Sequence, residues 1–309
     1  MCSSNAEPAT RFANDPILYL GSSHVLSLPY PLAPLLSSRE CFRMPEPIHP
    51  ISLIDLQEES LREVLYPNLE RTFYWSDDWD ADFYIALARA GFISISFRDA
   101  EHGTLLLPEL QRRYAVLDWE NLQVSSRIGK LMSSGRLEEE GIELCVLNNH
   151  EQVLDRVLDY HGRESTWLIK PYCELLGRLP TGDQGDFALQ GVELWSRKRN
   201  RLVAGEIGYT MGATYTSLSG FCTRPDPRWR GFGTLQMVLL AKRLKERGFA
   251  FWNMGHPEQA YKRALGAKLV DREIFLKRWL DARDAQPDRP LDQGNESPAS
   301  SGTSLYPKR

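Results

Sequence analysis

The sequence predicts a mixed α/β fold, in which a largely antiparallel sheet flanked by helices follows a smaller N-terminal α+β domain. Three observations predict it. The 309 residues suffice for about two domains, 42% of them are hydrophobic, and strand-like segments alternate with helical ones in the second half. A chain of this length buries a sizeable core without disulfides or metal ions.

Composition divides the chain into four parts. Residues 1–50 are rich in Ser and Pro without steady periodicity and are expected to be loosely ordered. Residues 281–309 are polar and nearly free of large apolar side chains, which predicts a disordered tail. Between them we expect a small helix-and-strand domain at residues 51–139 and the larger domain at residues 140–280.

The small domain is expected to contain a helix followed closely by a strand. Residues 80–90 have a helical pattern that stops at Gly91, and glycine commonly ends a helix. Residues 92–97 then place Phe and Ile at strand-like spacing. The chain therefore turns from helix to strand at Gly91.

The larger domain is predicted to begin with a strand at residues 141–147 and an amphipathic helix at residues 151–158, which Asn149 caps. Turns of Arg, Lys, Asn or Gly then separate three strands that read as an antiparallel meander, at residues 191–196, 202–210 and 213–222. A long helix is expected at residues 232–247, a strand at 249–254 and a short helix at 257–265. A last strand and helix are expected to follow, up to residue 280.

Several classes of protein and site are excluded by pattern. The five Cys are far apart without a C-x-x-C pair, and neither H-E-x-x-H nor a Ser/His/Asp arrangement occurs, so no metal, cofactor or hydrolase site is expected. No run of about 18 apolar residues exists, and the first fifteen residues lack a secretory pattern. We therefore expect a cytoplasmic protein, although the Ser-rich, acid-poor first forty residues leave a transit peptide open.

Charge is distributed unevenly along the chain. The net charge is −4, but residues 197–278 carry 17 Lys and Arg against six Asp and Glu, which gives +11 there and leaves −15 elsewhere. A solvated surface is the usual meaning of such a run, whereas a contiguous basic segment is also typical of a protein that binds a polyanion. A ligand that carries phosphate groups is thus one candidate.

The sharpest motif is the R-x-x-G-x-G of residues 228–233, between a predicted strand and the long helix. Glycines let backbone N–H groups of the first helical turn approach an anion, and the helix dipole adds positive potential. The alternative is a plain strand-to-helix turn with two surface arginines. The phosphate-binding candidates are Arg228, Arg230, Gly231, Gly233 and Thr234.

This strand, loop, helix and strand resembles motif A of the N-acetyltransferase (GNAT) superfamily. Residues 261–267, YKRALGA, resemble the aromatic and Leu-Gly segment that follows the next strand in that superfamily. The resemblance implies a GNAT-like sheet and gives Tyr261 the role of protonating a leaving thiolate. A Tyr packed on a helix face is the other interpretation.

A longer resemblance, over about residues 77–279, is to the leucyl/phenylalanyl-tRNA–protein transferase family. Its landmarks occur in order: TWL at 166–168 for "TWI", VELW at 192–195 for "SvE-x-W", and LVAGEIGY at 202–209 for "LvGGlYGv". Leu265, Gly266 and Ala267, with Arg272 and Phe275, match "slGA-x-x-i-x-R-x-x-F".

The sequence departs from this family where the family carries acidic residues. SLSGF at 217–221 stands for the family's "GESMF", so Leu218 replaces the acid and Gly220 the methionine. Asn253 stands where the family has the aspartate of "IDCQ". The pocket must therefore differ from the family's.

The resemblance implies an aminoacyltransferase that moves an amino acid from aminoacyl-tRNA to the N-terminal amine of an acceptor protein, as an N-terminal modification linked to protein degradation. Its partners would be aminoacyl-tRNA and the acceptor. Two alternatives stay open: an N-acyltransferase that uses a coenzyme A thioester, and a non-catalytic protein that binds tRNA or N-degrons.

The site is expected between the strand at residues 215–221 and the strand at residues 251–255. Asn253 or Ser219 would hold the attacking amine, which needs positioning more than a strong base. The other interpretation of Asn253 is a polar residue that satisfies hydrogen bonds in the core. The candidate substrate-binding residues are Glu193 and five aromatic residues that suit an adenine or an apolar side chain, or else belong to the core: Trp167, Trp195, Tyr209, Tyr215 and Phe221.

Overall fold

The computed structural model describes residues 48–99, 102–147, 150–182, 185–223, 226–257 and 259–292. Residues 1–47, which make up most of the segment expected to be loosely ordered, therefore lie outside the described residues. Asn149, the predicted helix cap, lies outside them as well. The larger sheet consists of β5 (Arg113–Leu117), β6 (Ile142–Leu147), β7 (Phe187–Ser196), β8 (Arg201–Met211), β9 (Thr214–Cys222), β10 (Phe251–Asn253) and β11 (Lys268–Asp271).

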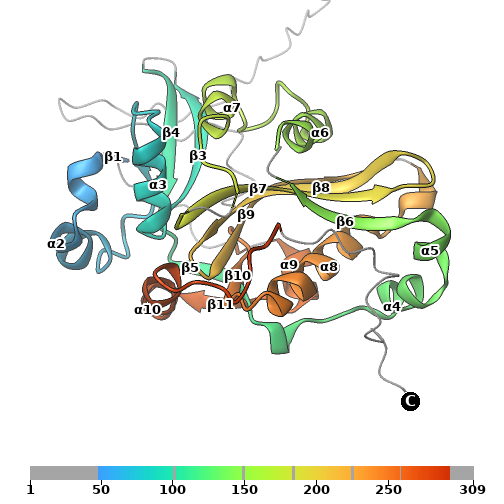
Figure 1. The fold of residues 1–309 in the computed structure, drawn as a ribbon. Helices are drawn as coiled ribbons and strands as arrows, with labels where there is room; N and C mark the ends of the chain where they lie inside the picture. Colours follow the sequence, from blue (N-terminus) through green and yellow to red (C-terminus); the bar gives the residue numbers. More distant parts are fainter. Residues whose placement is uncertain are drawn as a thin grey trace, which may run out of the picture.

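Helices surround this sheet. They are α3 (Ala81–Arg89), α4 (Ser126–Ser133), α5 (Arg136–Glu140), α6 (Glu151–His161), α7 (Lys170–Leu176), α8 (Phe232–Glu246), α9 (Ala260–Leu265) and α10 (Arg272–Arg283). Figure 1 shows α6 and α7 on one side of the sheet and α8 and α9 on the other. Each side encloses its own buried hydrophobic cluster.

The N-terminal part consists of short elements. These are β1 (His49–Pro50), η2 (Leu53–Leu56), α2 (Glu58–Ser60), η3 (Leu61–Leu65), β2 (Tyr74–Trp75), β3 (Ile93–Asp99) and β4 (Gly103–Glu109), with η4 (Trp119–Asn121) and η5 (Pro227–Trp229) later in the chain. β1 and β2 pair in parallel, and β3 and β4 form an antiparallel hairpin. The predicted helix-to-strand turn is present, because α3 ends before Gly91, which has φ +86°, and β3 follows.

The strand order in the larger sheet is β11-β5-β10-β9-β8-β7-β6. Its neighbours in the described residues are antiparallel except for β10 and β9, which are parallel. The predicted meander is β7, β8 and β9. The mixed, largely antiparallel sheet flanked by helices is thus confirmed.

Two predicted boundaries differ from the structure. β5, at residues 113–117, lies inside the larger sheet between β11 and β10, so a division at residue 139 cuts through that sheet. Local patterns cannot show this, since the partners of β5 are more than 130 residues away in sequence. At the C-terminal end, α10 extends to Arg283 and Leu291 is fully buried, so the expected disordered tail includes an ordered part. Residues 293–309 lie outside the described residues.

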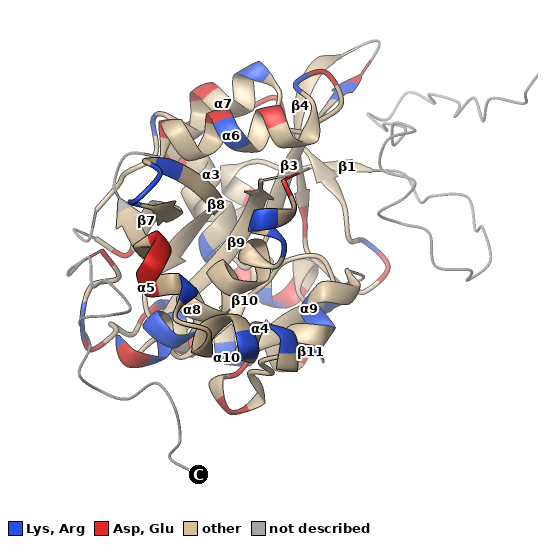
Figure 2. Ribbon diagram, turned by 90° about the vertical axis from the view of Figure 1, so that its right-hand side faces the viewer, with Lys and Arg blue, Asp and Glu red and all other residues tan. Residues whose placement is uncertain are grey.

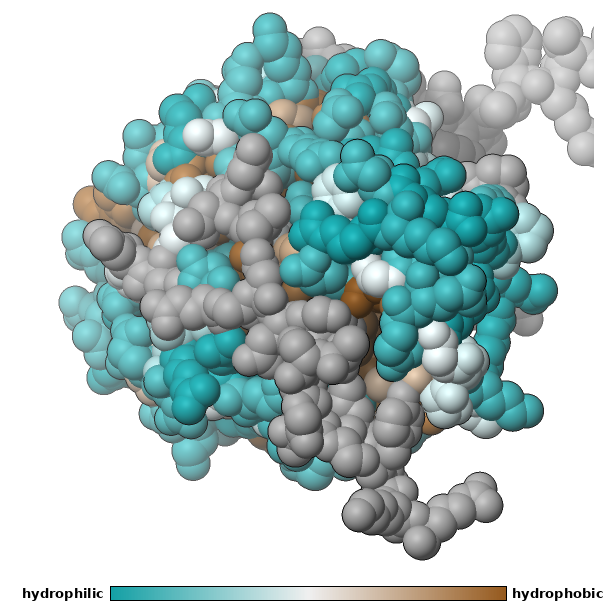
Figure 3. Space-filling view, turned by 45° about the vertical axis from the view of Figure 1, so that its right-hand side comes forward, coloured by the Kyte–Doolittle hydropathy of each residue, from teal (hydrophilic) through white to brown (hydrophobic). Residues whose placement is uncertain are grey.

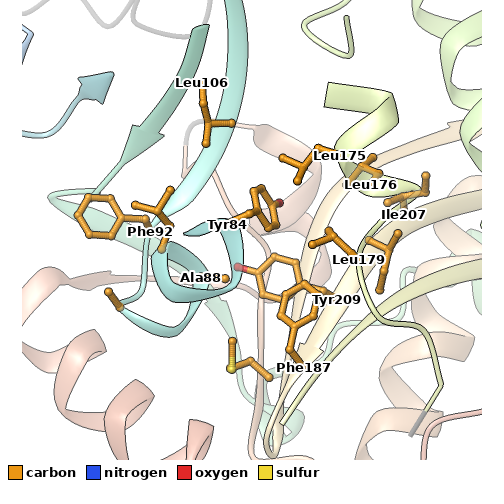
Figure 4. Packing of buried hydrophobic residues seen from close by; sticks show 14 of the residues in the cluster. Tyr84, Ala88, Phe92, Leu106, Leu175, Leu176, Leu179, Phe187, Ile207 and Tyr209 are labelled. Carbon is orange, nitrogen blue, oxygen red and sulfur yellow. The ribbon is translucent and has the colours of Figure 1, made fainter. Parts of the chain in front are cut away.

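Aromatic packing joins the N-terminal part to the sheet. Figure 4 shows Tyr84 of α3 directed toward Phe187 and Tyr209 of the sheet. The Phe187 and Tyr209 rings stack with centroids 5.1 Å apart, and the Tyr84 ring meets Phe187 edge-on at 6.4 Å. These contacts place α3 against the sheet. Within the described residues, no helix has the length and apolar character needed to cross a bilayer.

Arg272, the first residue of α10, ties the N-terminal loops to the rest of the molecule. Its side chain is 1% exposed, and its guanidinium donates to the carbonyl oxygens of Gln111 (2.9 Å), Arg71 (3.4 Å), Asn68 and Leu110. Burial lowers the pKa of Arg272. The backbone acceptors compensate for lost hydration, so this residue, matched above to the family pattern, is structural.

We expect Arg272→Met to destabilise the protein by about 3 kcal/mol or more, because several buried carbonyl groups lose their donors. Urea unfolding would measure the change. Lys277→Met, on the exposed face of the same helix, is the matched control and should change the free energy of unfolding by less than about 0.5 kcal/mol. Equal effects of the two variants would contradict this role.

Candidate functional site

A cavity of about 620 Å³ opens where β9 and β10 separate. The two strands pair only at Thr214–Thr216 with Phe251–Asn253, and the chain then turns away at Gly255, which has φ +75°. Beyond Thr216, β9 continues without β10 beside it. The cavity is therefore where the sequence placed the centre of the site.

The cavity has an apolar wall. Its side chains come from the residue before β2, from the β3–β4 hairpin, from the segment before α7, and from β9 and α8. They include Phe73, Ile93, Ile95, Trp167, Leu218, Phe221 and Met237. Figure 3 shows one face of the molecule, mostly hydrophilic, with hydrophobic residues visible in limited areas. An apolar wall of this kind suits an aliphatic or aromatic group of a ligand.

The opposite wall is polar and is built around Glu206 of β8. This carboxylate is 5% exposed and accepts hydrogen bonds from Tyr215 Oη (2.9 Å), Ser217 Oγ (2.8 Å) and Gln236 Nε2 (3.3 Å). Trp252 Nε1 in turn donates to Ser217 Oγ at 2.8 Å. Burial raises the pKa of Glu206 above its usual value, although the hydrogen bonds from the three donors oppose this shift.

Local geometry explains why these donors reach Glu206. A Cβ at Gly208 would lie 2.3 Å from Tyr215 Oη, so only glycine leaves room for the phenol to cross β8. β9 also carries one extra residue, Leu218, because Ser217 and Ser219 pair with the adjacent Gly208 and Ile207. Such a bulge re-aims side chains, and it lies at the cavity.

Lys262 of α9 lines the same polar wall. Its side chain is buried, and Nζ donates to the carbonyl oxygen of His256 at 2.8 Å. Burial lowers the pKa of Lys262 to about 7, while the charges of Glu206 and of Glu109 from β4 oppose this shift. Near neutral pH this amine therefore exists in both protonation states.

Ser219 lies at the cavity with its Oγ 3.2 Å from Nε2 of His161, the last residue of α6. The same nitrogen lies 3.2 Å from the Gly220 carbonyl oxygen. Neither residue belongs to a metal site, because no group of three or more His, Cys, Asp or Glu in the described ranges could hold a metal ion.

The N-terminus of α8 also opens into the cavity, through Gly233 and Thr234. Gly231 is the N-cap residue and has φ +95°, a conformation that favours glycine. The R-x-x-G-x-G therefore forms the predicted loop before a long helix. The exposed Arg228 and Arg230 flank this loop without lining the cavity.

Six of the predicted site residues line the cavity: Trp167, Ser219, Phe221, Gly233, Thr234 and Tyr261. Tyr215 stands behind the wall and holds Glu206. Tyr209 belongs to the core shown in Figure 4. Glu193 and Trp195 lie on β7, away from the cavity, where Trp195 Nε1 donates to Glu193 Oε2 at 2.6 Å. Strand β8 separates β7 from β9, and neither Glu193 nor Trp195 lines the cavity.

Asn253 also stands off the cavity wall, which corrects the expectation that it positions an amine. It is 1% exposed, and its Oδ1 accepts the Gly255 N–H at 3.1 Å. The side chain thus fixes the turn at which β10 separates from β9. The residues that sequence reasoning missed are Glu206, Ser217, Gln236 and Lys262; an acid inside an apolar strand, as in LVAGEIGY, was the available signal for Glu206.

The basic segment at residues 197–278 does not form one free basic surface. Lys262, Arg243 and Arg272 are buried, and acidic residues outside the segment pair with others: Arg197 with Glu143, Lys198 with Glu139, Arg199 with Glu140 and Arg278 with Asp118. Figure 2 accordingly shows basic and acidic residues interleaved around α4, α5, α8 and α10. The exposed side chains of Arg228 and Arg230 lie just before the N-terminus of α8.

We expect Asn253→Ala to lower the free energy of unfolding by about 1–3 kcal/mol, because the buried Gly255 N–H loses its acceptor. Urea unfolding would measure it. A variant with the stability of the wild type would show that Asn253 does not fix this turn.

We also expect Lys262 to give the protein a specific pH dependence of stability. The unfolded-state pKa of lysine is about 10.4, so the cost of burying the ammonium is complete below pH 7 and disappears as the pH rises toward 10. Relative to Lys262→Met, the wild type should gain up to about 1.4 kcal/mol per pH unit between pH 7 and 10.

Urea unfolding of both proteins between pH 6 and 10 would measure this difference. Lys268→Met, at an exposed position of β11, is the control and should follow the wild type in parallel. Parallel curves for Lys262→Met as well would contradict the expectation.

Comparison with known proteins gives a family. The sequence model of the family described as leucyl/phenylalanyl-tRNA protein transferase matches residues 116–280, slightly more than half of the chain. A comparison with curated protein sequences found no significant match.

Three solved structures show a distant similarity. The C-terminal domain (DUF2156) of an Agrobacterium fabrum protein described as a lysylphosphatidylglycerol synthetase is 15% identical, with a TM-score of 0.36 over 60% of this chain and 62% of that chain. L-PGS from Bacillus licheniformis is 15% identical, with a TM-score of 0.35 over 64% and 69%. FemX is 12% identical, with a TM-score of 0.37 over 75% and 80%. Because these identities and TM-scores are low, the family assignment rests on the sequence match alone.

Proposed function

Because this chain belongs to the leucyl/phenylalanyl-tRNA protein transferase family, we propose that it transfers an amino acid from aminoacyl-tRNA to the N-terminal amine of an acceptor protein. In this reaction the amine attacks the ester carbonyl, a C–N bond forms, and the bond to the terminal ribose oxygen breaks. The free amine is a sufficient nucleophile, so the protein must chiefly position it and stabilise the oxyanion.

The observation that carries the proposal is that one cavity joins an apolar wall to a buried, hydrogen-bonded carboxylate. An amine beside an apolar side chain needs these two environments side by side. Trp167 and Phe221 would contact the apolar group, and Glu206 would accept a hydrogen bond from the amine. Ser219 is a predicted residue that lines the cavity and can hydrogen-bond to either substrate.

The phosphates of the tRNA end would lie at the N-terminus of α8. Its Gly231 adjoins Arg127, whose Nε would lie 3.8 Å from a Cβ at that glycine. Arg136 donates to the Arg228 carbonyl oxygen and lies over the Phe232 ring, with 5.4 Å from its Cζ to the ring centroid. Helix dipole and guanidinium groups thus act on the same point.

A coenzyme A thioester is the second candidate donor. The observation that favours it is the opening of Gly233 and Thr234 into the cavity opposite Tyr261, which is half-exposed and could protonate a leaving thiolate. No cofactor belongs to either proposal, since the donor arrives as a substrate. The cytoplasmic location remains a prediction from the sequence.

Incubation with radiolabelled Leu-tRNA, Phe-tRNA and acetyl-CoA, each with an Arg-starting peptide, tests the donor. We expect label from an aminoacyl-tRNA on the free-amine peptide and none on the same peptide with an acetylated N-terminus. Label from acetyl-CoA alone, abolished in Tyr261→Phe, would replace the proposal with the coenzyme A alternative. Tight tRNA binding without transfer would indicate a non-catalytic relative.

Trp167→Ala should lower kcat/KM for the aminoacyl donor at least about 10-fold, because a large aromatic contact is lost from the cavity. The matched control is Trp195→Ala, which removes a Trp outside the cavity and should stay within about 3-fold of the wild type per folded molecule. Equal losses would contradict the assignment of the apolar wall.

A further inference from the structure

A buried carboxyl group and a buried amine line the cavity without contacting each other. Lys262 and Glu206 both line it, and both are 5% exposed. Within the described residues no ion pair joins them, so Nζ and the carboxylate oxygens lie more than 4.0 Å apart, although their charges influence each other. Buried opposite charges normally pair, so the gap between them is a place for a polar ligand atom.

Glu206 retains a position for one more hydrogen-bond donor. Its Oε1 accepts from Tyr215 and Ser217, whereas Oε2 accepts from Gln236 alone among the described residues. A carboxylate offers about four acceptor positions, two on each oxygen. One position on Oε2 is therefore left, and the cavity is where a donor can reach it.

Lys262 retains capacity as well. One N–H is engaged by the His256 carbonyl oxygen. The charges that act on it are those of Glu206 from β8 and Glu109 from β4, and Nζ lies 5.9 Å from the centroid of the Tyr261 ring. A neutral Nζ bound in this way keeps its lone pair, which makes it a proton acceptor.

The position opposite Glu206 is also unusual for the family. Glu206 pairs across the sheet with Gly220, which stands where the family has methionine, and a Cβ at Gly220 would lie 3.2 Å from Glu206 Cβ. The family pattern has an apolar residue at the position of Glu206. Compared with the family pattern, this chain therefore has an additional acid, Glu206, on β8 and lacks the family's acid at Leu218 on the neighbouring strand β9.

We propose, building on the proposed function, that the acceptor's N-terminal amine binds between Glu206 Oε2 and Lys262 Nζ, and that Lys262 accepts the proton lost by this amine. As the C–N bond forms, the proton moves from the amine nitrogen to Nζ. As the ester C–O bond breaks, the same proton passes to the ribose oxygen, which leaves as a hydroxyl. No proton is gained or lost overall.

Transfer kinetics test the proton step. In Lys262→Met, kcat should fall at least about 100-fold, the range of a lost general base, and the acidic limb of the pH profile should disappear. Filter binding of aminoacyl-tRNA should stay within about 3-fold. Lys262→Arg should not restore kcat, because a guanidinium does not release its proton. A Lys262→Met enzyme with the wild-type pH profile and kcat would overturn the assignment.

Acetylation of the wild-type protein by acetic anhydride, read by mass spectrometry between pH 5 and 10, tests the amine site without any transfer reaction. Lys262 should react with a midpoint near pH 7, and exposed Lys268 supplies the reference. An Arg-starting peptide in molar excess over the anhydride should protect Lys262, whereas its N-acetylated form should not.

The two experiments separate the two proposals. If no donor supports transfer while the free-amine peptide still protects Lys262, the proposed function fails and the amine site stands. If transfer occurs but Lys262 reacts like Lys268 and neither peptide protects it, the amine site fails and the proposed function stands.

Discussion

The short parallel pairing of β9 with β10 is the constraint on which the site depends. Only three residues of each strand pair, because Asn253 holds the turn at Gly255 and directs the chain away. Were the pairing to continue, side chains of both strands would fill the space between them. Instead β9 extends beyond its partner, and helix α8, strand β8 and the β3–β4 hairpin complete a cavity around its free part.

A buried carboxylate can exist in this cavity because three side chains donate hydrogen bonds to it. Tyr215, which does not line the cavity, crosses the bare backbone of Gly208 to reach Glu206, and Ser217 is itself held by Trp252. Residues behind the wall thus help to orient one that lines the cavity. This explains why an aromatic residue predicted to touch substrate is found supporting an acid instead.

The charge distribution shows a similar difference between chain and fold. The +11 of residues 197–278 is reduced by acids such as Glu140 and Glu143, which precede the segment and meet it across the β6–β7 edge. Arg199 lowers the pKa of Glu140, as a close ion pair should. Local charge excess therefore overstated the basic surface.

The sequence by itself determined most of the helices and strands, the antiparallel meander and the family, because these follow from local periodicity, turn residues and motif order. It also singled out Trp167, Ser219 and Gly233, which the structure brings to one cavity. Only the tertiary structure decided that β5 joins the larger sheet, that Asn253 supports a turn, and that Glu206 and Lys262 face one cavity. Their meeting depends on strand order, on a bulge at Leu218 and on which face of α9 is buried. Residues 56 positions apart in the chain carry no local signal of such proximity.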